Sequence, residues 1–395
     1  MIYIWFRKDL RIEDNKALYM AEKTGQELKY IYIMDKNVLF DENPRRKKFI
    51  LDRVKGLDDK LDGKLIIEEG NPIDIFRRFK KLEEFEIYFN RNYEPYEIER
   101  DKMVAAEFET HSFKDFVLHE RDEILKSDGN PYKVFTAYYN KWKEKDKDIE
   151  YGVSKNAILD DFIENGVIKY ETTRDYPNLD STSKLSAYIN CGAVSIRAVY
   201  YRAYEKYLDT KNEEILTFIK QLAWRDFFIQ IMYHYPRAEK EAFITKYKNI
   251  KWENDMSKIE AWKKGETGFD FVDAGMKELN QTGYMHNRLR MLVASFLVKN
   301  LNVDWRIGEA YFREKLIDYD LALNNGGWQW SASTGVDSVP YFRIFNPKRQ
   351  QERFDKDKGY INKYLKNNFT NGEIVDYNET RDNYKNKIKS MGEEK

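Results

Sequence analysis

The chain of 395 residues is long enough for two or three domains and a sizeable core. Its formal net charge is zero, which argues against a polybasic arm but allows a basic face that an acidic face balances. Its one cysteine, Cys191, excludes an intrachain disulfide and fits a reducing compartment. No apolar run reaches the length of a membrane span, and the charged N-terminal segment is too poor in apolar residues for a signal peptide. We therefore expect a cytoplasmic protein that does not enter a membrane.

In the first third of the chain, short apolar runs alternate with charged segments of helical periodicity. The apolar runs are Ile2–Phe6, Tyr30–Met34, Leu65–Ile67, Phe85–Phe89 and Phe116–Leu118. The helical segments between them are Asp14–Lys23, Pro44–Leu61, Pro72–Leu82 and Tyr96–Glu109, and Asp14, Asn43 and Asn71 lie where helix N-caps belong. This alternation predicts a parallel sheet that is covered by helices on both faces.

The first predicted strand is not followed by G-x-G-x-x-G, so the standard dinucleotide fingerprint is absent there. A ligand can still bind at the carboxyl edge of a parallel sheet. The residues that we expect to gather at this edge are Arg7, Lys8, Asp35 and Asn90–Glu94.

From Ser127 to about Tyr176 the periodicity weakens, which predicts a connector. After Asp180 the sequence predicts helices over Lys184–Ile189, Ser195–Lys206, Glu213–Tyr233, Ser257–Lys264, Phe269–Gln281, Met285–Asn300, Trp305–Leu316 and Tyr377–Lys389. We therefore expect an α/β N-terminal domain with a parallel, Rossmann-like sheet in residues 1–126, a connector in residues 127–178, and an all-α domain in residues 179–395.

The stretch Leu316–Ser333 holds two acids, two amides, two glycines and two tryptophans, a mixture that is not typical of a core helix. One interpretation is a site for a flat polar ligand, in which Asp318, Asp320 and Asn324 bond to a ring edge and Trp328 and Trp330 offer flat faces. The other is an acidic helix C-terminus that stops at Asn-Asn-Gly-Gly, with both tryptophans in the core.

Four other segments are candidates for binding, and each has an ordinary structural alternative. Ser181–Ser186 opens a helix, where hydroxyl and N–H groups can hold a pyrophosphate or simply cap the helix. Gln221 and Trp224 share a helix face, which suits a wet cleft for a flat polar ligand or a core stripe. In Thr282–Met291, Asn287 and Met291 share a face, while His286 is more typical of a structural histidine. Tyr341–Gln350 mixes basic and aromatic residues, which suits a phosphate backbone or a solvated turn.

No His, Cys and carboxylate set has metal spacing, and no Ser–His–Asp arrangement stands out. The candidate segments are rich in Asn, Met, Trp and Gln, which are poor acids and bases. A site that is built from them implies that a cofactor performs the reaction.

Five motifs together resemble the photolyase/cryptochrome family, and most of all its class I cyclobutane pyrimidine dimer (CPD) photolyases. They are W-F-R-K-D-L-R-I-E-D-N, S-D-G-N-P-Y-K-V-F-T-A-Y-Y-N-K-W, Q-L-A-W-R-D-F-F, T-G-Y-M-H-N-R-L-R-M-L-V-A-S-F-L-V-K and Y-D-L-A-L-N-N-G-G-W-Q-W-S-A-S-T-G. The last of these continues into S-T-G-V-D-S-V-P-Y-F-R-I-F-N-P, and the resemblance covers nearly the whole chain.

The resemblance implies that FAD binds in the helical domain. It assigns the phosphates and ribitol of FAD to Tyr170, Thr182, Ser183, Lys184, Leu185 and Ser186. It places Asp318 and Arg290 as a pair beside the isoalloxazine, Asp320 at its pyrimidine edge and Asn324 at N5. Trp252, Trp305 and Trp328 match the family's electron-carrying tryptophan chain.

For this family the implied reaction is light-driven splitting of cyclobutane dimers in UV-damaged DNA by an electron from reduced FAD. The resemblance assigns the flipped dimer or its phosphates to Arg174, Gln221, Trp224, Arg225, Asn287, Arg288, Met291, Trp330 and Arg343. It also implies a monomer that works at the nucleoid. It allows a second, antenna chromophore, namely a folate, a deazaflavin or a flavin. Glu94 matches an antenna-contacting acid of the family only loosely.

Three positions bear on the branch of the family. Asn287 and Met291 stand where (6-4) photolyases have histidines, which favours cyclobutane dimers. Gln221 stands where class I enzymes usually have glutamate, and glutamine there resembles (6-4) photolyases and animal cryptochromes. The alternatives are a blue-light receptor without repair activity, a (6-4) photolyase, and a flavin-binding nucleic-acid module without photochemistry.

Overall fold

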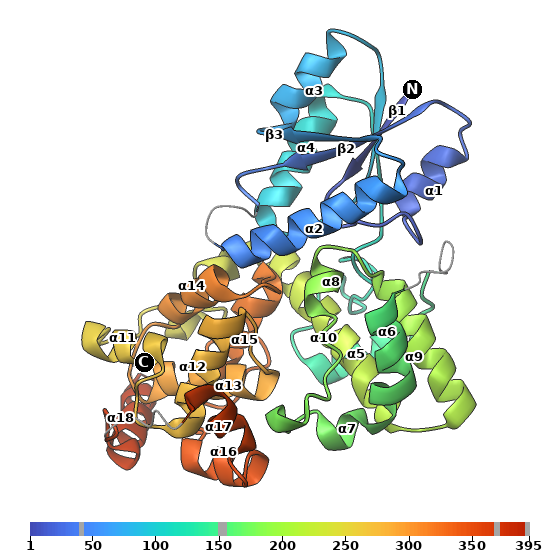
Figure 1. Ribbon diagram of the computed structural model, residues 1–395. Helices are drawn as coiled ribbons and strands as arrows, with labels where there is room; N and C mark the ends of the chain where they lie inside the picture. Colours follow the sequence, from blue (N-terminus) through green and yellow to red (C-terminus); the bar gives the residue numbers. More distant parts are fainter. Residues whose placement is uncertain (39–42, 149–155, 367–371, 392–395) are drawn as a thin grey trace. The chain divides into compact units, whose positions relative to one another are not determined.

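The computed structural model describes residues 1–38, 43–148, 156–366 and 372–391. The chain divides into two compact units: unit 1 holds Met1–Tyr170 and Ser183–His234, and unit 2 holds Glu171–Thr182 and Tyr235–Lys395. Unit 1 contains a sheet with its helices, and unit 2 is helical (Figure 1). The expected fold class is confirmed, whereas the boundaries at residues 126 and 178 remain predictions.

Five parallel strands form the sheet of unit 1, in the order β3-β2-β1-β4-β5. They are β1 (Ile2–Phe6), β2 (Leu28–Met34), β3 (Leu65–Glu69), β4 (Glu86–Asn90) and β5 (Thr110–Phe113). The first four apolar runs each fall in a strand, so the predicted parallel sheet is confirmed.

The fifth predicted strand was wrong. Phe116–Leu118 is buried but lies outside any strand, and the edge strand is the more polar Thr110–Phe113. The backbone N–H groups of Leu118 and His119 donate to the Asp226 carboxylate at 3.4 and 3.1 Å. The Asp226 carboxylate on α10 (Glu214–His234) therefore supplies the hydrogen-bond acceptors that a neighbouring strand would supply if this segment were a strand.

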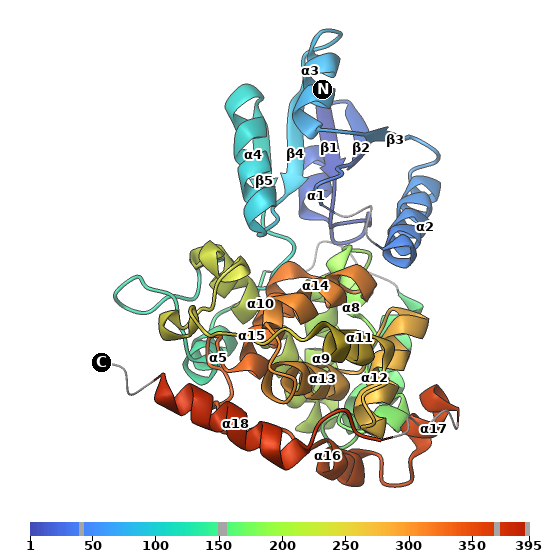
Figure 2. The ribbon, with the colours of Figure 1, turned by 90° about the vertical axis from the view of Figure 1, so that its left-hand side faces the viewer.

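Alternate side chains of β1 enter two hydrophobic cores, one on each face of the sheet. Ile2, Ile4 and Phe6 belong to one core, and Tyr3 and Trp5 belong to the other. The first core is completed by α1 (Lys16–Glu22) and α2 (Pro44–Lys60), and the second by α3 (Pro72–Lys80) and α4 (Pro95–Glu107). Helices thus lie on both faces, as predicted (Figure 2).

Two of the three predicted helix caps are confirmed. Asn43 and Asn71 accept backbone N–H bonds at the starts of α2 and α3. Asp14 does not cap α1, because Asn15 does so, and Asp14 instead has a φ of +47°. Its carboxylate binds the guanidinium of Arg197 at 3.0 Å, so a long-range ion pair replaces the local cap.

A buried ionic network joins the β1–α1 loop to α9 (Ile196–Thr210). Arg11 and Arg197 lie 2.7 and 2.6 Å from the same oxygen of Asp115, and all three side chains are at most 3% exposed. Burial acts to raise the pKa of Asp115, but the two guanidinium groups hold this pKa below its usual value. Removing one partner of such a network leaves a buried charge uncompensated, which costs roughly 3–5 kcal/mol.

The remaining helices of unit 1 are α5 (Phe135–Glu144), α6 (Ala157–Asp161) and α8 (Ser186–Asn190), and α7 (Tyr170–Thr173) lies at the boundary between the units. Unit 2 contains α11 (Met256–Lys264), α12 (Asp270–Thr282), α13 (Asn287–Lys299), α14 (Trp305–Lys315), α15 (Leu321–Ala332), α16 (Pro347–Phe354), α17 (Gly359–Leu365) and α18 (Tyr377–Ser390). Each helix predicted after Asp180 overlaps an observed one, but α15, α16 and α17 were not predicted.

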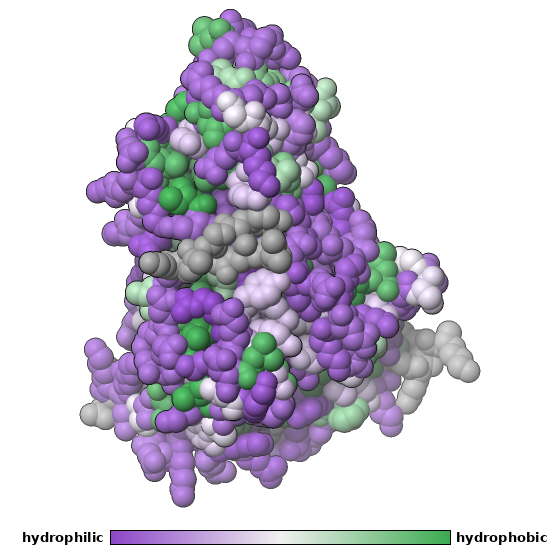
Figure 3. Space-filling view, turned by 90° about the vertical axis from the view of Figure 1, so that its right-hand side faces the viewer, coloured by the Kyte–Doolittle hydropathy of each residue, from purple (hydrophilic) through white to green (hydrophobic). Residues whose placement is uncertain are grey.

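Hydrophobic side chains lie scattered among hydrophilic ones on the molecular face shown in Figure 3. Within the described residues, no helix combines the length and apolar character that crossing a bilayer requires.

Candidate functional site

In unit 2, a buried ion pair joins α13 to the residues that precede α15. The guanidinium Nη2 of Arg290 lies 2.9 and 3.0 Å from the two carboxylate oxygens of Asp318, and the Asp318 side chain is 4% exposed. Arg290 Nε also donates to the Met285 carbonyl at 2.7 Å. Burial acts to lower the pKa of Arg290, but the Asp318 carboxylate raises it, so the guanidinium keeps its charge. The predicted Arg290–Asp318 pair is therefore present.

Helix α15 runs straight through Asn324-Asn325-Gly326-Gly327, so the interpretation of these residues as a helix stop was wrong. Asp320 caps the helix, because its carboxylate accepts from the Leu323 N–H at 3.0 Å. The cap and the packing described below offset the low helix propensity of the amides and glycines. Asn324 and the polar residues that follow it are therefore presented by a helix, whereas Asp318 and Asp320 lie in the segment just before it.

The amide of Asn324 is held in one orientation by Glu309 of α14. Its Nδ2 donates to the backbone carbonyl of Glu309 at 3.2 Å and to the Glu309 side chain at 2.9 Å. A backbone carbonyl can only accept, so the nitrogen must face Glu309 and the Asn324 oxygen faces the opposite way. Burial raises the pKa of Glu309, against the lowering effect of bonds from Asn324 and Tyr319. The arrangement leaves Asn324 Oδ1 able to accept a hydrogen bond from a ligand.

These groups fit a flavin in their chemistry. The N5–H of a reduced isoalloxazine is a donor, which the Asn324 oxygen matches as an acceptor. Arg290, half-buried and paired with the buried Asp318, supplies a positive charge for an anionic ring, and Asp320 supplies acceptor oxygens for ring N–H groups. The three residues lie on or beside α13 and α15, so the fold of unit 2 positions all of them.

Trp328 lies on α15 in the main core of unit 2 and is 2% exposed. Its indole packs edge-to-face on Phe312, with ring centroids 5.0 Å apart, and on Trp262 at 6.0 Å. Gly308 of α14 lies directly against the ring, because a Cβ at this glycine would stand 2.1 Å from Trp328 Cη2. The absence of a side chain at Gly308 therefore makes room for the indole.

The other two tryptophans of the predicted electron chain also lie in unit 2. Trp305 is the first residue of α14 and is 1% exposed. Trp252 is half-buried against the same core, and the Lys387 ammonium lies 5.2 Å from the centre of its ring. Of the three, Trp252 is the one most open to solvent, which suits the outer end of an electron chain.

The start of α13 carries the predicted substrate residues of unit 2. His286 caps this helix, since its Nδ1 accepts from the Arg288 N–H at 3.1 Å, and burial lowers its pKa to about 4. The interpretation of His286 as a structural histidine is thus confirmed. Asn287 is exposed and Met291 is half-buried one turn later, while the Arg288 guanidinium lies 2.6 Å from Asp175.

The remaining predicted residues of unit 2 differ in exposure. Trp330 of α15 and Arg174 are half-buried. Arg343 is exposed, and its backbone carbonyl accepts from the Lys299 ammonium at 3.1 Å. Thr182, also in unit 2, is half-buried.

In unit 1, the indole of Trp224 is stacked on Phe135 of α5. The two rings are nearly parallel, at 7°, with centroids 3.5 Å apart, and Phe228 adds a third ring at 5.5 Å from Trp224. Gln221 lies one turn before Trp224 on α10, and its Nε2 donates to the Thr217 carbonyl at 3.1 Å. Gln221 and Trp224 are both half-buried. Phe135 thus covers one face of the Trp224 indole.

Arg225 is buried under the segment that contains Phe116. Its guanidinium lies 4.1 Å from the centre of the Phe116 ring and donates to the Phe116 carbonyl at 2.6 Å, and the residue is 6% exposed. This position gives Arg225 a structural role beside Asp226. A contact of Arg225 with DNA remains a prediction.

The residues assigned to the FAD phosphates lie around the start of α8. Tyr170 is half-buried and packs its ring edge-to-face on Phe218, with centroids 5.3 Å apart. Leu185 is buried, Lys184 is exposed with a φ of +52°, and Ser183 and Ser186 are half-buried. The helix begins at Ser186 rather than at Lys184, and the residues before it are irregular, with Lys184 at a positive φ and Leu185 in the right-handed helical region.

Charged groups meet at the carboxyl edge of the sheet, as predicted. The pairs are Arg7 with the Asn90 carbonyl, Lys8 with Glu94 at 2.6 Å, and Arg100 with Asp35 at 3.5 Å. Each of these charged side chains has a hydrogen-bond or ion-pair partner at this edge, and these interactions stabilise the edge. A chromophore at this edge remains a prediction.

Three residues that shape the site were missed in the sequence. Glu309 orients Asn324, Gly308 makes room for Trp328, and Phe135 stacks on Trp224. Each acts through a contact between different helices, so no local pattern could have identified it.

Comparisons with known proteins agree with these features. Residues 2–154 match the family model "DNA photolyase", and residues 218–390 match "FAD binding domain of DNA photolyase". The chain is 36% identical to the deoxyribodipyrimidine photo-lyase of Halobacterium salinarum, over 92% of this chain and 89% of that protein. It is 34% identical to the enzyme of the same name from Escherichia coli, over 92% and 88%. The crystal structure of an archaeal photolyase from Sulfolobus tokodaii, which holds two FAD molecules, matches with a TM-score of 0.87 at 32% identity, over 99% of this chain and 100% of that chain.

Proposed function

We propose that this chain, which belongs to the DNA photolyase family, is a light-dependent lyase that repairs cyclobutane pyrimidine dimers in DNA. The observation that supports this most directly is the set of Arg290, Asp318 and Asn324 within the matched FAD-binding domain. A fixed positive charge and an oriented acceptor oxygen are the groups that a reduced, anionic flavin requires.

Reduced FAD, when bound and excited by blue light, supplies one electron that opens the cyclobutane ring and is then returned. The residues of the chain hold this cofactor and exclude other reactions. Asp318 would keep the Arg290 guanidinium in place beside the ring, Asp320 would accept from the pyrimidine edge, and Asn324 would accept at N5. Tyr170 and Thr182–Ser186 would hold the phosphates and ribitol. No side chain of this set must donate or accept a proton during ring opening.

Trp252, Trp305 and Trp328 would pass electrons inward from the protein surface and so return bound FAD to its reduced state. Their burial supports this order, because Trp252 is half-buried, whereas Trp305 and Trp328 are at most 2% exposed. The packing of Trp328 against α14 supports its assignment to the inner end of the chain.

The dimer must leave the base stack to be repaired, which costs a few kcal/mol and least for a damaged step. We assign Trp224 and Trp330 to stacking on the flipped bases, and Asn287, Met291 and Gln221 to contacts with their edges. Because Phe135 already covers one face of Trp224, only the other face can stack on a base. Arg174, Arg225, Arg288 and Arg343 are assigned to the phosphates or the damaged bases.

The type of lesion follows from the start of α13. Asn287 and Met291 offer an amide and a thioether where (6-4) photolyases have histidines, so no acid stands there to protonate a lesion. The amide of Gln221 can donate an N–H to a thymine carbonyl but cannot share a proton with it, so we expect slower turnover than with a glutamate.

We also propose that the protein acts as a monomer on chromosomal DNA in the cytoplasm, and that it uses a second chromophore of the folate, deazaflavin or flavin class. The Sulfolobus tokodaii photolyase, with its two FAD molecules, supports a flavin as one of these options. Absorption spectra of natively purified protein and size-exclusion chromatography test the two proposals.

The experiment that tests the main proposal mixes purified, reduced protein with an oligonucleotide that contains one thymine dimer, in blue light and in darkness. We expect dimers to disappear only in the light. Retention of dimers by protein that carries reduced FAD would reject the lyase, and flavin photoreduction without repair would favour a light receptor instead. Protein that is colourless and refuses added FAD would reject both.

A further inference from the structure

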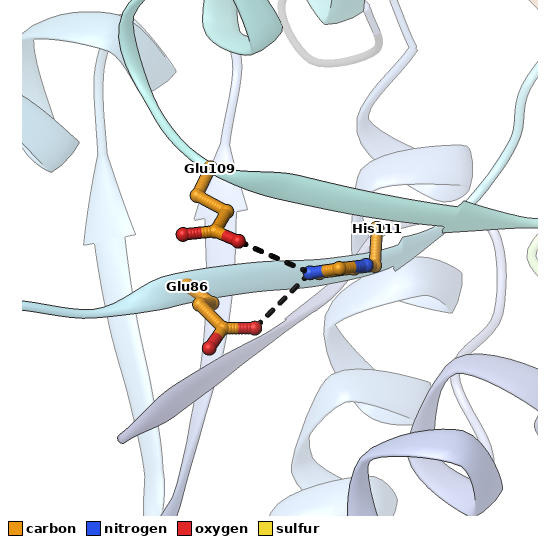
Figure 4. Close-up of side chains that lie close together, drawn as sticks. All are labelled: Glu86, Glu109 and His111. Carbon is orange, nitrogen blue, oxygen red and sulfur yellow. Dashed lines mark ion pairs between the residues drawn. The ribbon is translucent and has the colours of Figure 1, made fainter.

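Three side chains with metal-ligating groups, none of them assigned to FAD or DNA, meet at the edge of the sheet in unit 1. Glu86 opens β4, His111 lies within β5, and Glu109 directly precedes β5. In the parallel register Ile87 pairs with Thr110. Because side chains alternate along a strand, Glu86, Glu109 and His111 lie on one face of these two strands. Figure 4 shows the edge of the imidazole pointing between the two carboxylates.

The distances suit a shared cation. His111 Nε2 lies 3.0 Å from Glu86 Oε2 and 3.9 Å from Glu109 Oε1, and one ligand atom of each residue lies within 4.8 Å of the others. Four ligands around a zinc ion at 2.0–2.2 Å stand about 3.4 Å apart. The two separations from His111 Nε2 lie on either side of this value, so small movements of the side chains, chiefly of Glu109, would bring all three groups onto one ion.

Two features of the cluster suit a bound cation. Glu86 and Glu109 are direct cross-strand neighbours, and like charges in such a pair destabilise a sheet. In the described part of the chain, neither carboxylate forms an ion pair with a lysine or arginine. Among the same residues, His111 Nε2 is shielded from solvent and faces both carboxylates, at 3.0 and 3.9 Å, without hydrogen-bond geometry to either. A cation among the three groups would give Nε2 and both carboxylates a common partner.

The surroundings hold two of the three ligands in place. The ring of Tyr88 packs on the His111 imidazole with centroids 4.5 Å apart. Gln26 Nε2 lies 3.4 Å from the Glu86 oxygen that faces away from His111. Such outer contacts orient metal ligands and raise metal affinity. The Glu109 side chain is 71% exposed and must come inward from solvent, which implies a moderate affinity.

We propose that Glu86, Glu109 and His111 form a site for one divalent first-row transition-metal ion, best matched by Zn²⁺, that ties the edge strand β5 to β4. One imidazole nitrogen and two carboxylate oxygens are common zinc ligands, and a water completes four-coordination. The ion offsets the repulsion between the carboxylates and stabilises the exposed edge of the sheet. The site is independent of the proposed repair reaction.

The ligands show no metal spacing along the sequence because they lie on two strands. Glu109 and His111 are two residues apart, but Glu86 joins them only through strand pairing.

The test is calorimetric titration of EDTA-treated, full-length protein with Zn²⁺, and of the His111→Ala and Glu109→Gln variants. A matched control is Glu99→Gln, which changes an exposed acid on α4 that pairs with Lys102. We expect one equivalent of Zn²⁺ to bind to the wild type and the control, with affinity reduced at least about tenfold in both site variants. Co²⁺ should give a visible absorption band in the wild type that is absent in His111→Ala.

Zn²⁺ should also raise the melting temperature of the wild type but not of His111→Ala, because a ligand that binds only the folded state stabilises it. Equal Zn²⁺ affinity in wild type and His111→Ala, or no saturable binding, would overturn the proposal and leave the cluster an ion triad of protonated His111. Should His111→Ala fail to fold, Glu109→Gln decides the matter, since its side chain is exposed. Dimer repair in light should be unchanged in both site variants, so a failure of the repair assay does not bear on the metal site.

Discussion

Replacing Gly308 with alanine should destabilise the protein, although an alanine in the middle of a helix normally does the opposite. On propensity alone, Gly→Ala inside a helix adds about 1 kcal/mol of stability. At Gly308 the new Cβ would lie 2.1 and 2.3 Å from two ring carbons of Trp328 and 2.7 Å from Leu297 Cδ2. The indole is rigid and buried, so either the ring or α14 must move, and overpacking of this kind costs typically about 1–3 kcal/mol. Because the overlap is severe, we expect the clash to exceed the propensity gain.

The matched control is Gly56→Ala in α2, an exposed helical glycine with no heavy atom within 4 Å of the added Cβ. Circular dichroism melting of both variants should show Gly308→Ala below the wild type and Gly56→Ala at or above it. Displacement of Trp328 should also slow photoreduction of bound FAD in Gly308→Ala alone. If Gly308→Ala melts as high as Gly56→Ala, the close packing of Trp328 on α14 would be refuted.

Three further predictions concern single side chains. Trp252→Phe should slow photoreduction but leave repair by pre-reduced protein intact, and an equal loss of both would reject Trp252 as an electron carrier. Trp224→Ala should weaken binding to dimer-containing DNA by roughly 1–3 kcal/mol for one stacked base, measured against undamaged DNA, and unchanged discrimination would count against this placement. Burial lowers the pKa of Lys299 to about 7, from 10.5 in the unfolded chain, so unfolding takes up a proton between these values. The free energy of unfolding should therefore rise with pH across this window, by at most about 1.4 kcal/mol per pH unit. Urea titrations should show this rise to be absent in Lys299→Met.

The sheet could be predicted from the sequence because its information is local. Each of the first four strands is an apolar run that lies between helical segments, and Asn43 and Asn71 precede prolines in the way that helix caps do. Phe116–Leu118 has the same apolar pattern, but its N–H groups bond to Asp226, far away in the sequence. A pattern shows that a segment is buried but not which acceptor completes its hydrogen bonds.

Much of the candidate site could be predicted only through the resemblance. The hydrogen-bonding groups of Asp318, Asp320 and Asn324 indicated that they could bind the edge of a flat polar ligand. The composition of the stretch, however, predicted no helix where α15 carries Asn324. The partner of Asn324, Glu309, belongs to another helix and has no local signature. The cluster of Glu86, Glu109 and His111 was invisible for the same reason, since strand pairing alone brings it together.

Helix α15, whose composition is unfavourable for a helix, is stabilised by tertiary contacts that its residues make on two sides. Asn325 and Gln329, one turn apart, donate to the carbonyls of Glu239 and Ala238 at 3.1 and 2.8 Å. On the side toward α14, Asn324 bonds to Glu309 and Trp328 packs on Gly308. A helix with this composition would not form alone, so α15 folds only when the core of unit 2 forms around it. The acceptor oxygen of Asn324 is therefore positioned by the same contacts that stabilise unit 2. Binding of FAD and folding of unit 2 must then be thermodynamically linked, since the cofactor can bind only where α15 is already in place.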